Sequence, residues 1–200
     1  AATRMFPSIR FVHLGSCFEY GHCSGPIDEF QPLKPTSIYG STKATGSLSL
    51  IELAKSSTAN ILILRLFGFW GPGEKSNRLV PQIVQASQTR SALELTPGEQ
   101  VRDFMDVGDM SRLIADLALN MSIPSGTVLN VGSGIPISVK DFARAIAKEL
   151  DCLNLLRIGA KNYRSNEMME LYADTRRLRD FVNLDPVTPL RVGLAEMLKH

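Results

Sequence analysis

The chain has 200 residues, with 22 Lys+Arg against 20 Asp+Glu and a formal net charge of +2. Hydrophobic residues make up 44% and charged residues 21%, which is too apolar for a disordered chain. The charge is too balanced for a dedicated nucleic-acid binder, and no apolar run reaches the roughly 18 residues that a membrane helix needs. A chain of this size buries about 70% of its unfolded surface, so the composition predicts a soluble globular protein of one large or two small domains.

The three cysteines and three histidines do not suggest a metal site. The cysteine count is odd, no two cysteines have CxxC spacing, and no two histidines have HxxxH spacing, so we expect no structural zinc. Free thiols favour a reducing, cytoplasmic setting.

The first half of the chain alternates between apolar runs and turn-rich segments. Residues 9–14 read as a short buried strand, and residues 17–36 as a long loop. Residues 38–57 have helical periodicity. Residues 61–67 are apolar almost throughout, as in a parallel strand that is covered on both faces.

The second half continues this alternation without an internal repeat. Ser138 and Asp141 resemble a capping box that opens a helix. The alternation predicts an α/β fold with a mainly parallel sheet. Helices are predicted over 79–88, 107–120, 138–150 and 175–181, and strands over 93–95 and 127–131.

Tyr39 and Lys43 stand four residues apart at the start of the first predicted helix, so their side chains share one face. A free tyrosine titrates near about pH 10, and a neighbouring ammonium favours its phenolate form. Such a pair can act as general acid or base on an alcohol or carbonyl. Taken alone, however, the spacing is better explained by a solvated helix face.

Ser16 follows the first predicted strand, and ligand-contacting residues of α/β proteins lie at the carboxyl ends of strands. A hydroxyl there can bind the substrate oxygen that exchanges a proton with Tyr39. A loop-capping serine explains this position about as well when no other residue is considered.

Several blocks together resemble those of the extended short-chain dehydrogenases/reductases, in the order of that family. Each block is modest, but the set covers nearly the whole chain and points to the NAD-dependent epimerase/dehydratase group that acts on nucleotide sugars. The blocks are residues 15–21 (GSCFEYG), 35–43 (PTSIYGSTK), 65–73 (RLFGFWGPG), 100–109 (QVRDFMDVGD), 130–134 (NVGSG), 173–175 (ADT) and 193–194 (GL).

The resemblance implies a catalytic triad of Ser16, Tyr39 and Lys43. In such enzymes a hydride passes between C4 of the sugar and the nicotinamide of NAD or NADP, while the tyrosine moves a proton to or from the sugar hydroxyl. All three residues would contact the cofactor, and Lys43 would bind the nicotinamide ribose.

The resemblance also implies four residues that bind a nucleotide-diphosphate sugar. Arg102 would hold the phosphates, which suits a guanidinium fork, and Arg164 lies in a looser motif of the same kind. Arg78 and Leu79 would line the nucleotide pocket. For either arginine the alternative is a surface ion pair. This alternative is less favoured for Arg102 than for Arg164.

Three departures from the family pattern qualify the resemblance. Gly132 and Gly134 follow a strand, but the third glycine of a dinucleotide fingerprint and its acidic partner are missing. The acidic pair of 4,6-dehydratases is replaced by Cys17 and Phe18, which argues against dehydration because that reaction needs an acid and a base. Gly68 stands where the family has an asparagine, which puts substrate contacts there in question.

The fingerprint is expected about 100 residues upstream of Ser16, so we interpret the sequence as about two thirds of a chain of roughly 300 residues. Residues 1–72 are predicted to be the C-terminal half of a Rossmann domain. Residues 73–200 are predicted to form mainly a smaller α/β lobe that binds the sugar nucleotide, with segments near Val107 and Val128 returning to the first domain. Alone, the 200 residues are expected to be inactive and poorly soluble, because the sheet exposes an edge and an apolar face.

The leading functional hypothesis is an NAD(P)-dependent nucleotide-sugar 4-epimerase. The alternatives are an NAD(P)H-dependent 4-keto reductase of a nucleotide deoxysugar and a non-catalytic NAD(P)-binding protein. The same Tyr39 and Lys43 serve epimerase and reductase, so the base, the sugar and the choice of NAD or NADP stay open. Family members often form homodimers through the YxxxK helix. Leu48 and Ile51 fit that interface and a core role equally well. No nucleic-acid or membrane partner is expected.

Overall fold

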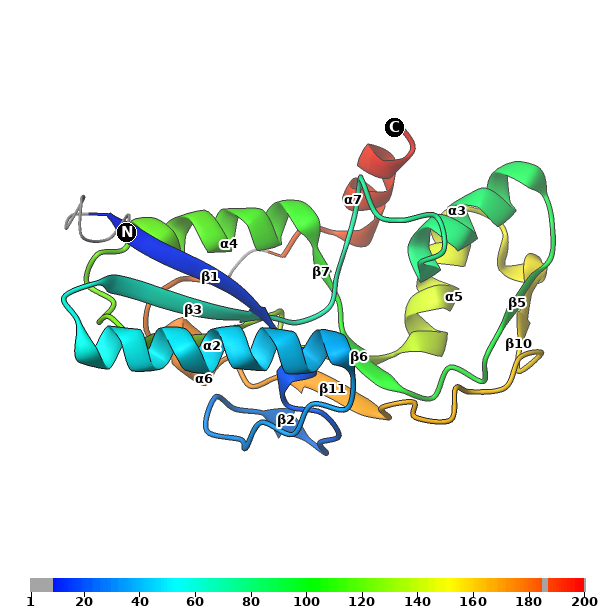
Figure 1. Ribbon diagram of the computed structural model, residues 1–200. Helices are drawn as coiled ribbons and strands as arrows, with labels where there is room; N and C mark the ends of the chain where they lie inside the picture. The colour runs from blue at the N-terminus through cyan, green and yellow to red at the C-terminus, as the bar shows by residue number, and fades with distance from the viewer. Residues whose placement is uncertain (1–8, 185–186, 200) are drawn as a thin grey trace.

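A computed structural model describes residues 9–184 and 187–199. Its centre is a parallel sheet of three strands, β1 (Arg10–Ser16), β3 (Asn60–Leu66) and β8 (Thr127–Val131), in the order β1-β3-β8 (Figure 1). Ser16 pairs with Leu66, and Leu66 with Val131. The carboxyl ends of the three strands therefore meet at one edge of the sheet.

Helices cover both faces of this sheet because β3 sends apolar side chains to each. Ile61 and Ile63 face α2 (Ile38–Ser56). Leu62 and Leu64 face α4 (Val107–Leu119) and α6 (Arg176–Arg179). The buried strand that the apolar run predicted is thus confirmed, and Figure 1 shows the sheet between α2 and α4.

Short segments extend the first lobe at the carboxyl edge of the sheet. The turn η1 (Cys17–Glu19) follows β1 directly. Beyond it lies a second sheet in the order β2-β11-β6-β9, in which only β6 and β9 run antiparallel. Its strands are β2 (Pro26–Ile27), β11 (Glu170–Ala173), β6 (Val101–Asp103) and β9 (Pro136–Ser138).

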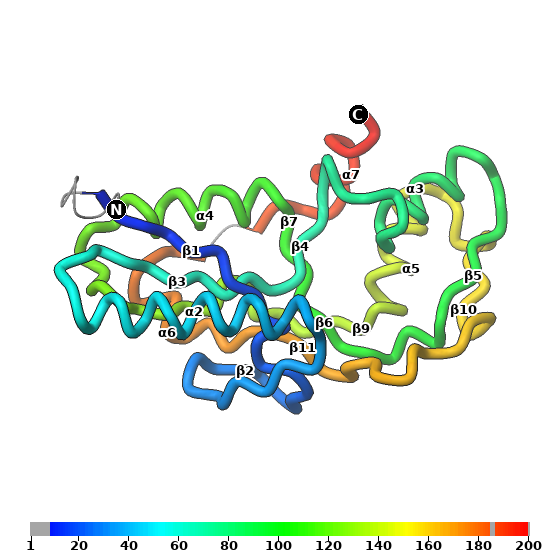
Figure 2. Tube along the Cα trace, in the orientation of Figure 1, coloured from blue at the N-terminus to red at the C-terminus, as the bar shows by residue number. Residues whose placement is uncertain are grey.

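A second lobe lies beyond this edge, and Figure 2 shows its chain trace on the right. Helices α3 (Leu79–Thr89) and α5 (Val139–Glu149) pack in one apolar cluster beside the paired strands β5 (Leu93–Leu95) and β10 (Leu156–Ile158). Phe104 joins this cluster by stacking on Phe142, with ring centroids 4.0 Å apart. The remaining elements are the paired strands β4 (Phe69–Trp70) and β7 (Met105–Asp106), the turn η2 (Leu153–Leu155) and the helix α7 (Leu190–Met197).

The structure confirms the longer predicted elements and the short strand predicted over 93–95, and it corrects other short elements. The helix predicted over 175–181 spans only Arg176–Arg179, and α7 was not predicted. The predicted loop 17–36 contains η1 and β2. Strands of two to four residues give too few alternating positions to be recognised from periodicity. Residues 1–8, 185–186 and 200 lie outside the described part of the chain.

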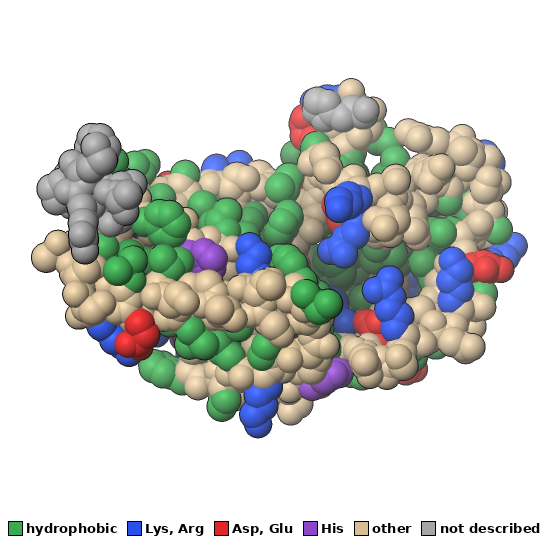
Figure 3. Space-filling view, viewed as in Figure 1, with side chains coloured by type: hydrophobic (Ala, Val, Ile, Leu, Met, Phe, Trp, Pro, Cys, Tyr) green, Lys and Arg blue, Asp and Glu red, His purple; other side chains and the backbone are tan. Residues whose placement is uncertain are grey.

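The outer side of β1 is apolar and open to solvent. Within the described residues β1 pairs only with β3, and Ile9, Phe11 and Leu14 are 42–50% exposed. Figure 3 shows hydrophobic side chains gathered over this part of the sheet. On α2, Ile51 packs against the core and Leu48 is exposed, so the place of Leu48 in a dimer interface stays a prediction. No helix in the described residues is long and apolar enough to cross a membrane.

Candidate functional site

Ser16 is held at the carboxyl end of β1 by the turn that follows it. Its hydroxyl accepts a hydrogen bond from the Phe18 amide (3.3 Å), and its own amide donates to Oε1 of Glu19 (2.9 Å). This reciprocal pattern is a capping box that opens η1. Ser16 is 5% exposed, so both its backbone and its side chain are fixed before any ligand arrives.

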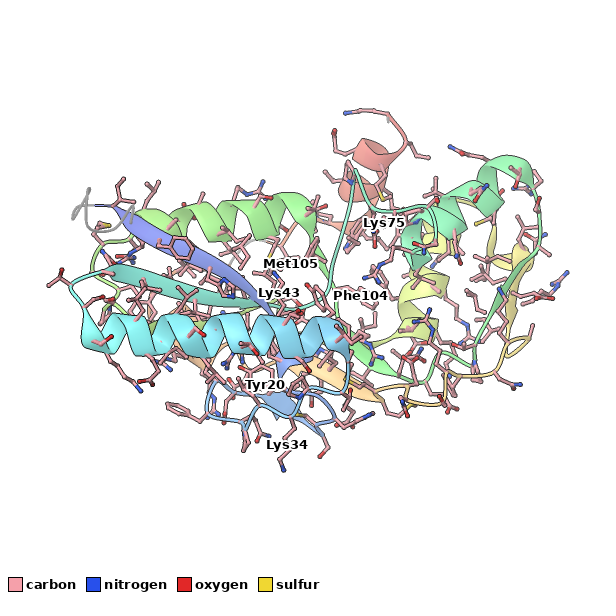
Figure 4. The ribbon with its side chains drawn as sticks, viewed as in Figure 1. Tyr20, Lys34, Lys43, Lys75, Phe104 and Met105 are labelled. Atoms are coloured by element: carbon pink, nitrogen blue, oxygen red, sulfur yellow. The ribbon has the colours of Figure 1, made fainter. Side chains whose placement is uncertain are left out.

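Tyr39 and Lys43 lie on the first turns of α2, beside the same end of β1. Ser37 caps the helix by accepting from the Gly40 amide. The Lys43 ammonium donates to the carbonyl of Leu14 (2.8 Å) and lies 5.8 Å from the centre of the Tyr39 ring. The four-residue spacing therefore places both side chains on one face, as predicted, and Figure 4 shows Lys43 near the end of the sheet.

The Tyr39 hydroxyl is accessible while its ring is supported. Tyr39 is 54% exposed, and its hydroxyl has no hydrogen-bond partner in residues 9–184 and 187–199. The Phe18 ring contacts the Tyr39 ring edge-on at 6.1 Å. The tyrosine is thus oriented by an aromatic contact, and its side chain is accessible from solvent.

A buried ionic network lies directly behind Ser16. Glu19 is fully buried and forms an ion pair with Arg65 of β3 (Nε to Oε2, 3.0 Å). Arg65 also donates to the hydroxyl of Tyr20 (2.9 Å), and that hydroxyl donates to Oδ1 of Asn130 (2.6 Å). Burial raises the pKa of Tyr20 to about 12. Tyr20 therefore acts here as a neutral hydrogen-bonding group between β3 and β8.

Arg102 comes from β6 and lies between the two lobes. Its guanidinium forms an ion pair with Glu167 (2.7 Å) and donates to the carbonyl of its neighbour Val101 (2.8 Å). The next residue, Asp103, is fully buried, and its carboxylate accepts from the amides of Ser133 and Gly134. Burial raises the pKa of Asp103, and these hydrogen bonds act in the opposite direction. The carboxylate anchors β6 and thereby the base of Arg102.

The same contacts explain two departures from the family pattern. The Ser133 and Gly134 amides are already bound to Asp103, so this glycine turn does not present them to a phosphate. A side chain at Gly68 would collide with the backbone carbonyl of Asp103. The close approach of these two backbones therefore accounts for glycine in place of the asparagine expected there.

A cavity of about 210 Å³ opens in the second lobe between α3, β5 and the start of α5. Leu79 and Arg164 line it, together with Lys140 and Lys161; the binding of a nucleotide sugar by these two predicted residues stays a prediction. Arg78 does not line it; its side chain is exposed and lies 3.7 Å from Glu74. Figure 3 shows Lys and Arg side chains around a hollow between the two lobes. The full lining is Asn77, Leu79, Gln82, Glu94, Leu95, Thr96, Gly98, Val139, Lys140, Ile158, Lys161 and Arg164.

Comparison with known proteins gives the family. The model of the NAD dependent epimerase/dehydratase family matches residues 1–132. The chain belongs to this family. It is similar to the CDP-abequose synthase of Salmonella typhimurium, with 30% identity over an alignment of 141 residues that covers 68% of this chain and 47% of that protein. It is also 26% identical to an uncharacterized UDP-glucose epimerase of Bacillus subtilis, over 95% of this chain and 60% of that protein.

Among solved structures, the complex of MoeE5 with UDP-glucuronic acid and NAD superimposes with a TM-score of 0.83 and 26% identity, over 99% of this chain and 66% of that one. The chain spans 47% and 60% of the lengths of the two curated relatives. The Rossmann-like α/β fold of this epimerase/dehydratase chain is thus confirmed.

The structure groups the predicted residues of this epimerase/dehydratase chain into two sets. Ser16, Tyr39 and Lys43 meet at the carboxyl edge of the sheet, while Leu79 and Arg164 lie in the second lobe. No role was predicted for the partners of these residues. They are Glu19 and Arg65 behind the serine, Glu167 on Arg102, and Lys140 and Lys161 at the cavity. The only sequence signal for them is an acidic residue three positions after Ser16 and after Arg164.

Proposed function

We propose that the protein is an NAD(P)-dependent epimerase that inverts C4 of the sugar in a nucleotide-diphosphate sugar. The observation that carries the proposal is the meeting of Ser16, Tyr39 and Lys43 at the carboxyl edge of the parallel sheet. Ligands of α/β proteins bind at this edge. Family membership supports the same reaction class.

Tyr39 is the proton-transfer group in this proposal. Its accessible hydroxyl can exchange a proton with the sugar hydroxyl, and the Lys43 ammonium lies 5.8 Å from the centre of its ring. The Ser16 hydroxyl, fixed at the strand end, can donate a hydrogen bond to the same sugar oxygen. Proton transfer by such a positioned group contributes about 10²- to 10⁴-fold to the rate.

The edge also fits the nicotinamide ribose of NAD or NADP. Lys43 uses one of its three N–H groups on the Leu14 carbonyl, which leaves two for ribose hydroxyls. NAD(P) supplies a reversible hydride acceptor to such a site. The glycine turn at Ser133 and Gly134 has its amides bound to Asp103, so we assign the cofactor's pyrophosphate to residues other than these.

The second lobe and Arg102 would bind the nucleotide diphosphate. The Arg102 guanidinium donates to Glu167 at 2.7 Å and to the Val101 carbonyl, and its remaining N–H groups can bind phosphate oxygens. Arg164, Lys140 and Lys161 add positive charge at the cavity, and guanidinium groups suit phosphate oxygens. Leu79 supplies an apolar wall for the base.

Two residues next to Ser16 argue against dehydration. Cys17 is buried, and burial raises the pKa of its thiol to about 12, so it does not ionise near neutrality. Phe18 offers only a ring, which packs on Tyr39. Neither residue can supply the acid and base that elimination of water requires.

Four substrate classes test the proposal. The natural protein is incubated with NAD and with UDP-, dTDP-, CDP- or GDP-hexose, while products are separated and the nicotinamide absorbance is followed. We expect a C4-inverted sugar from one nucleotide series, with no net change in absorbance. Net consumption of NAD(P)H with a 4-keto sugar would instead establish a reductase, and a 4-keto-6-deoxy product would establish a dehydratase.

A further inference from the structure

Glu19 is a buried carboxylate that contacts three separate elements of the first lobe. Its Oε1 accepts from the Ser16 amide (2.9 Å) and from the Ser47 hydroxyl of α2 (3.0 Å). Its Oε2 accepts from Nε of Arg65 on β3 (3.0 Å). A side chain at Gly15 would collide with Oε1, so the backbone before Ser16 is shaped to admit this carboxylate.

These contacts fix α2 against the strand end that carries Ser16. Ser47 lies one helical turn after Lys43 on α2, and Lys43 is itself bound to the Leu14 carbonyl of β1 (2.8 Å). The helix is thus attached to β1 at two points, one through Lys43 and one through Ser47 and Glu19. Because Tyr39 is on the same helix, both attachments set the distance between Tyr39 and Ser16.

We propose that Glu19 is a positioning residue whose carboxylate oxygen holds Ser16 and the Tyr39-bearing helix in their working geometry. The inference rests on the proposed function. It concerns the oxygen acceptor rather than the charge: Arg65 balances the charge at 3.0 Å and connects the carboxylate to the Tyr20 hydroxyl. Buried, fully bonded networks of this kind fix a geometry, and a displacement of about 1 Å in a site can cost about 100-fold in rate.

Two double variants isolate the role of the oxygen. Glu19→Gln with Arg65→Met removes both charges but keeps an oxygen that can accept from Ser16 and Ser47. Glu19→Met with Arg65→Met removes the same charges and keeps a similar side-chain volume, without that acceptor. Neither variant leaves a buried charge unpaired, which would be strongly destabilising. The two double variants therefore differ mainly in whether the side chain at position 19 carries an oxygen that accepts hydrogen bonds.

Both variants are made in the natural protein, and two properties are measured: kcat and KM for the nucleotide sugar, and hydrogen exchange of the Ser16 amide. We expect kcat of the double variant with Glu19→Met to be about 10- to 100-fold below that of the double variant with Glu19→Gln. The KM values of the two should differ by less than about twofold. The Ser16 amide should exchange faster in the Glu19→Met variant. A role in stability alone would lower the melting temperature without this separation of kcat from KM.

Equal kcat values in the two variants would overturn the inference. If the unmodified protein has no activity on any nucleotide sugar, the proposed function fails, and the exchange measurement still decides whether Glu19 holds the strand end. Equal exchange of the Ser16 amide in both variants would then overturn the positioning role as well.

Discussion

The carboxyl edge of the sheet and the cavity of the second lobe differ in how their polar groups are held. At the edge, Glu19 and Asp103 are fully buried, and each carboxylate accepts several hydrogen bonds. At the cavity, Lys161 and Arg164 are exposed, and neither forms an ion pair in the described residues. One region is bonded internally, and the other directs its charges to solvent.

This difference suits the two tasks proposed for these regions. Proton transfer needs reacting groups that are fixed before the substrate arrives, whereas a site for a nucleotide diphosphate can use flexible side chains that adapt to the phosphates. Arg102 belongs to both regions, since its backbone follows the fixed β6 and its guanidinium is partly exposed beside Glu167. Variants in the two regions should therefore affect different kinetic constants.

The largest effect is expected at the fixed edge. Tyr39→Phe should lower kcat by about 10²- to 10⁴-fold and leave KM for the nucleotide sugar almost unchanged, because only the proton-transfer hydroxyl is lost. Tyr39 is 54% exposed, so the melting temperature should stay close to that of the parent. Tyr172→Phe, on β11, is the matched control, and retained activity in Tyr39→Phe would refute the catalytic assignment.

The second largest effect is expected where the regions meet. Arg102→Met should raise KM about 10- to 100-fold, because a hydrogen bond to a charged group contributes about 1.5–3 kcal/mol. It also leaves Glu167, the Arg102 partner at 2.7 Å, facing the phosphates. The double variant Arg102→Met with Glu167→Gln should recover part of the loss. A fall in kcat with unchanged KM would place Arg102 in the chemistry rather than in binding.

A smaller effect is expected at the cavity. Arg164→Ala should raise KM by only about two- to fivefold, because charges that stay exposed to solvent contribute about 1 kcal/mol or less, and should leave kcat unchanged. Initial rates measured at two salt concentrations test the electrostatic origin, since screening should reduce the difference between parent and variant. Arg164 lines the cavity and Arg179 ends α6, so Arg179→Ala serves as the control without effect.

The smallest effect concerns Cys17. Because burial raises the pKa of its thiol to about 12, the reactive thiolate forms only as the pH approaches that value. Iodoacetamide between pH 7 and 9 should therefore leave Cys17 unlabelled, while the half-buried Cys23 reacts increasingly. Peptide mass spectrometry after partial labelling distinguishes the two. Labelling of Cys17 at pH 7 would show that water reaches the strand end behind Ser16.

The sequence predicted the two regions unequally well. The strand at β3 and the helices α2 and α4 follow from runs long enough to show their periodicity, and Ser16, Tyr39 and Lys43 occur in recognisable blocks. The network of Glu19, Arg65 and Ser47 could not be predicted, because its members are 18 to 46 residues apart along the chain and meet only after β1, β3 and α2 pack. Short strands such as β6 are likewise defined by their partners rather than by their own residues.

The central claim is that hydride leaves and returns to C4 of the sugar at the carboxyl edge of the parallel sheet, while Tyr39 moves the hydroxyl proton. It is tested most directly by incubating the natural protein and NAD with the reactive nucleotide hexose carrying deuterium at C4. The account predicts a C4-inverted product that keeps its deuterium, together with a slower rate than the unlabelled sugar. Deuterium lost to solvent or to free NAD(P)H, or inversion without an isotope effect, would contradict it.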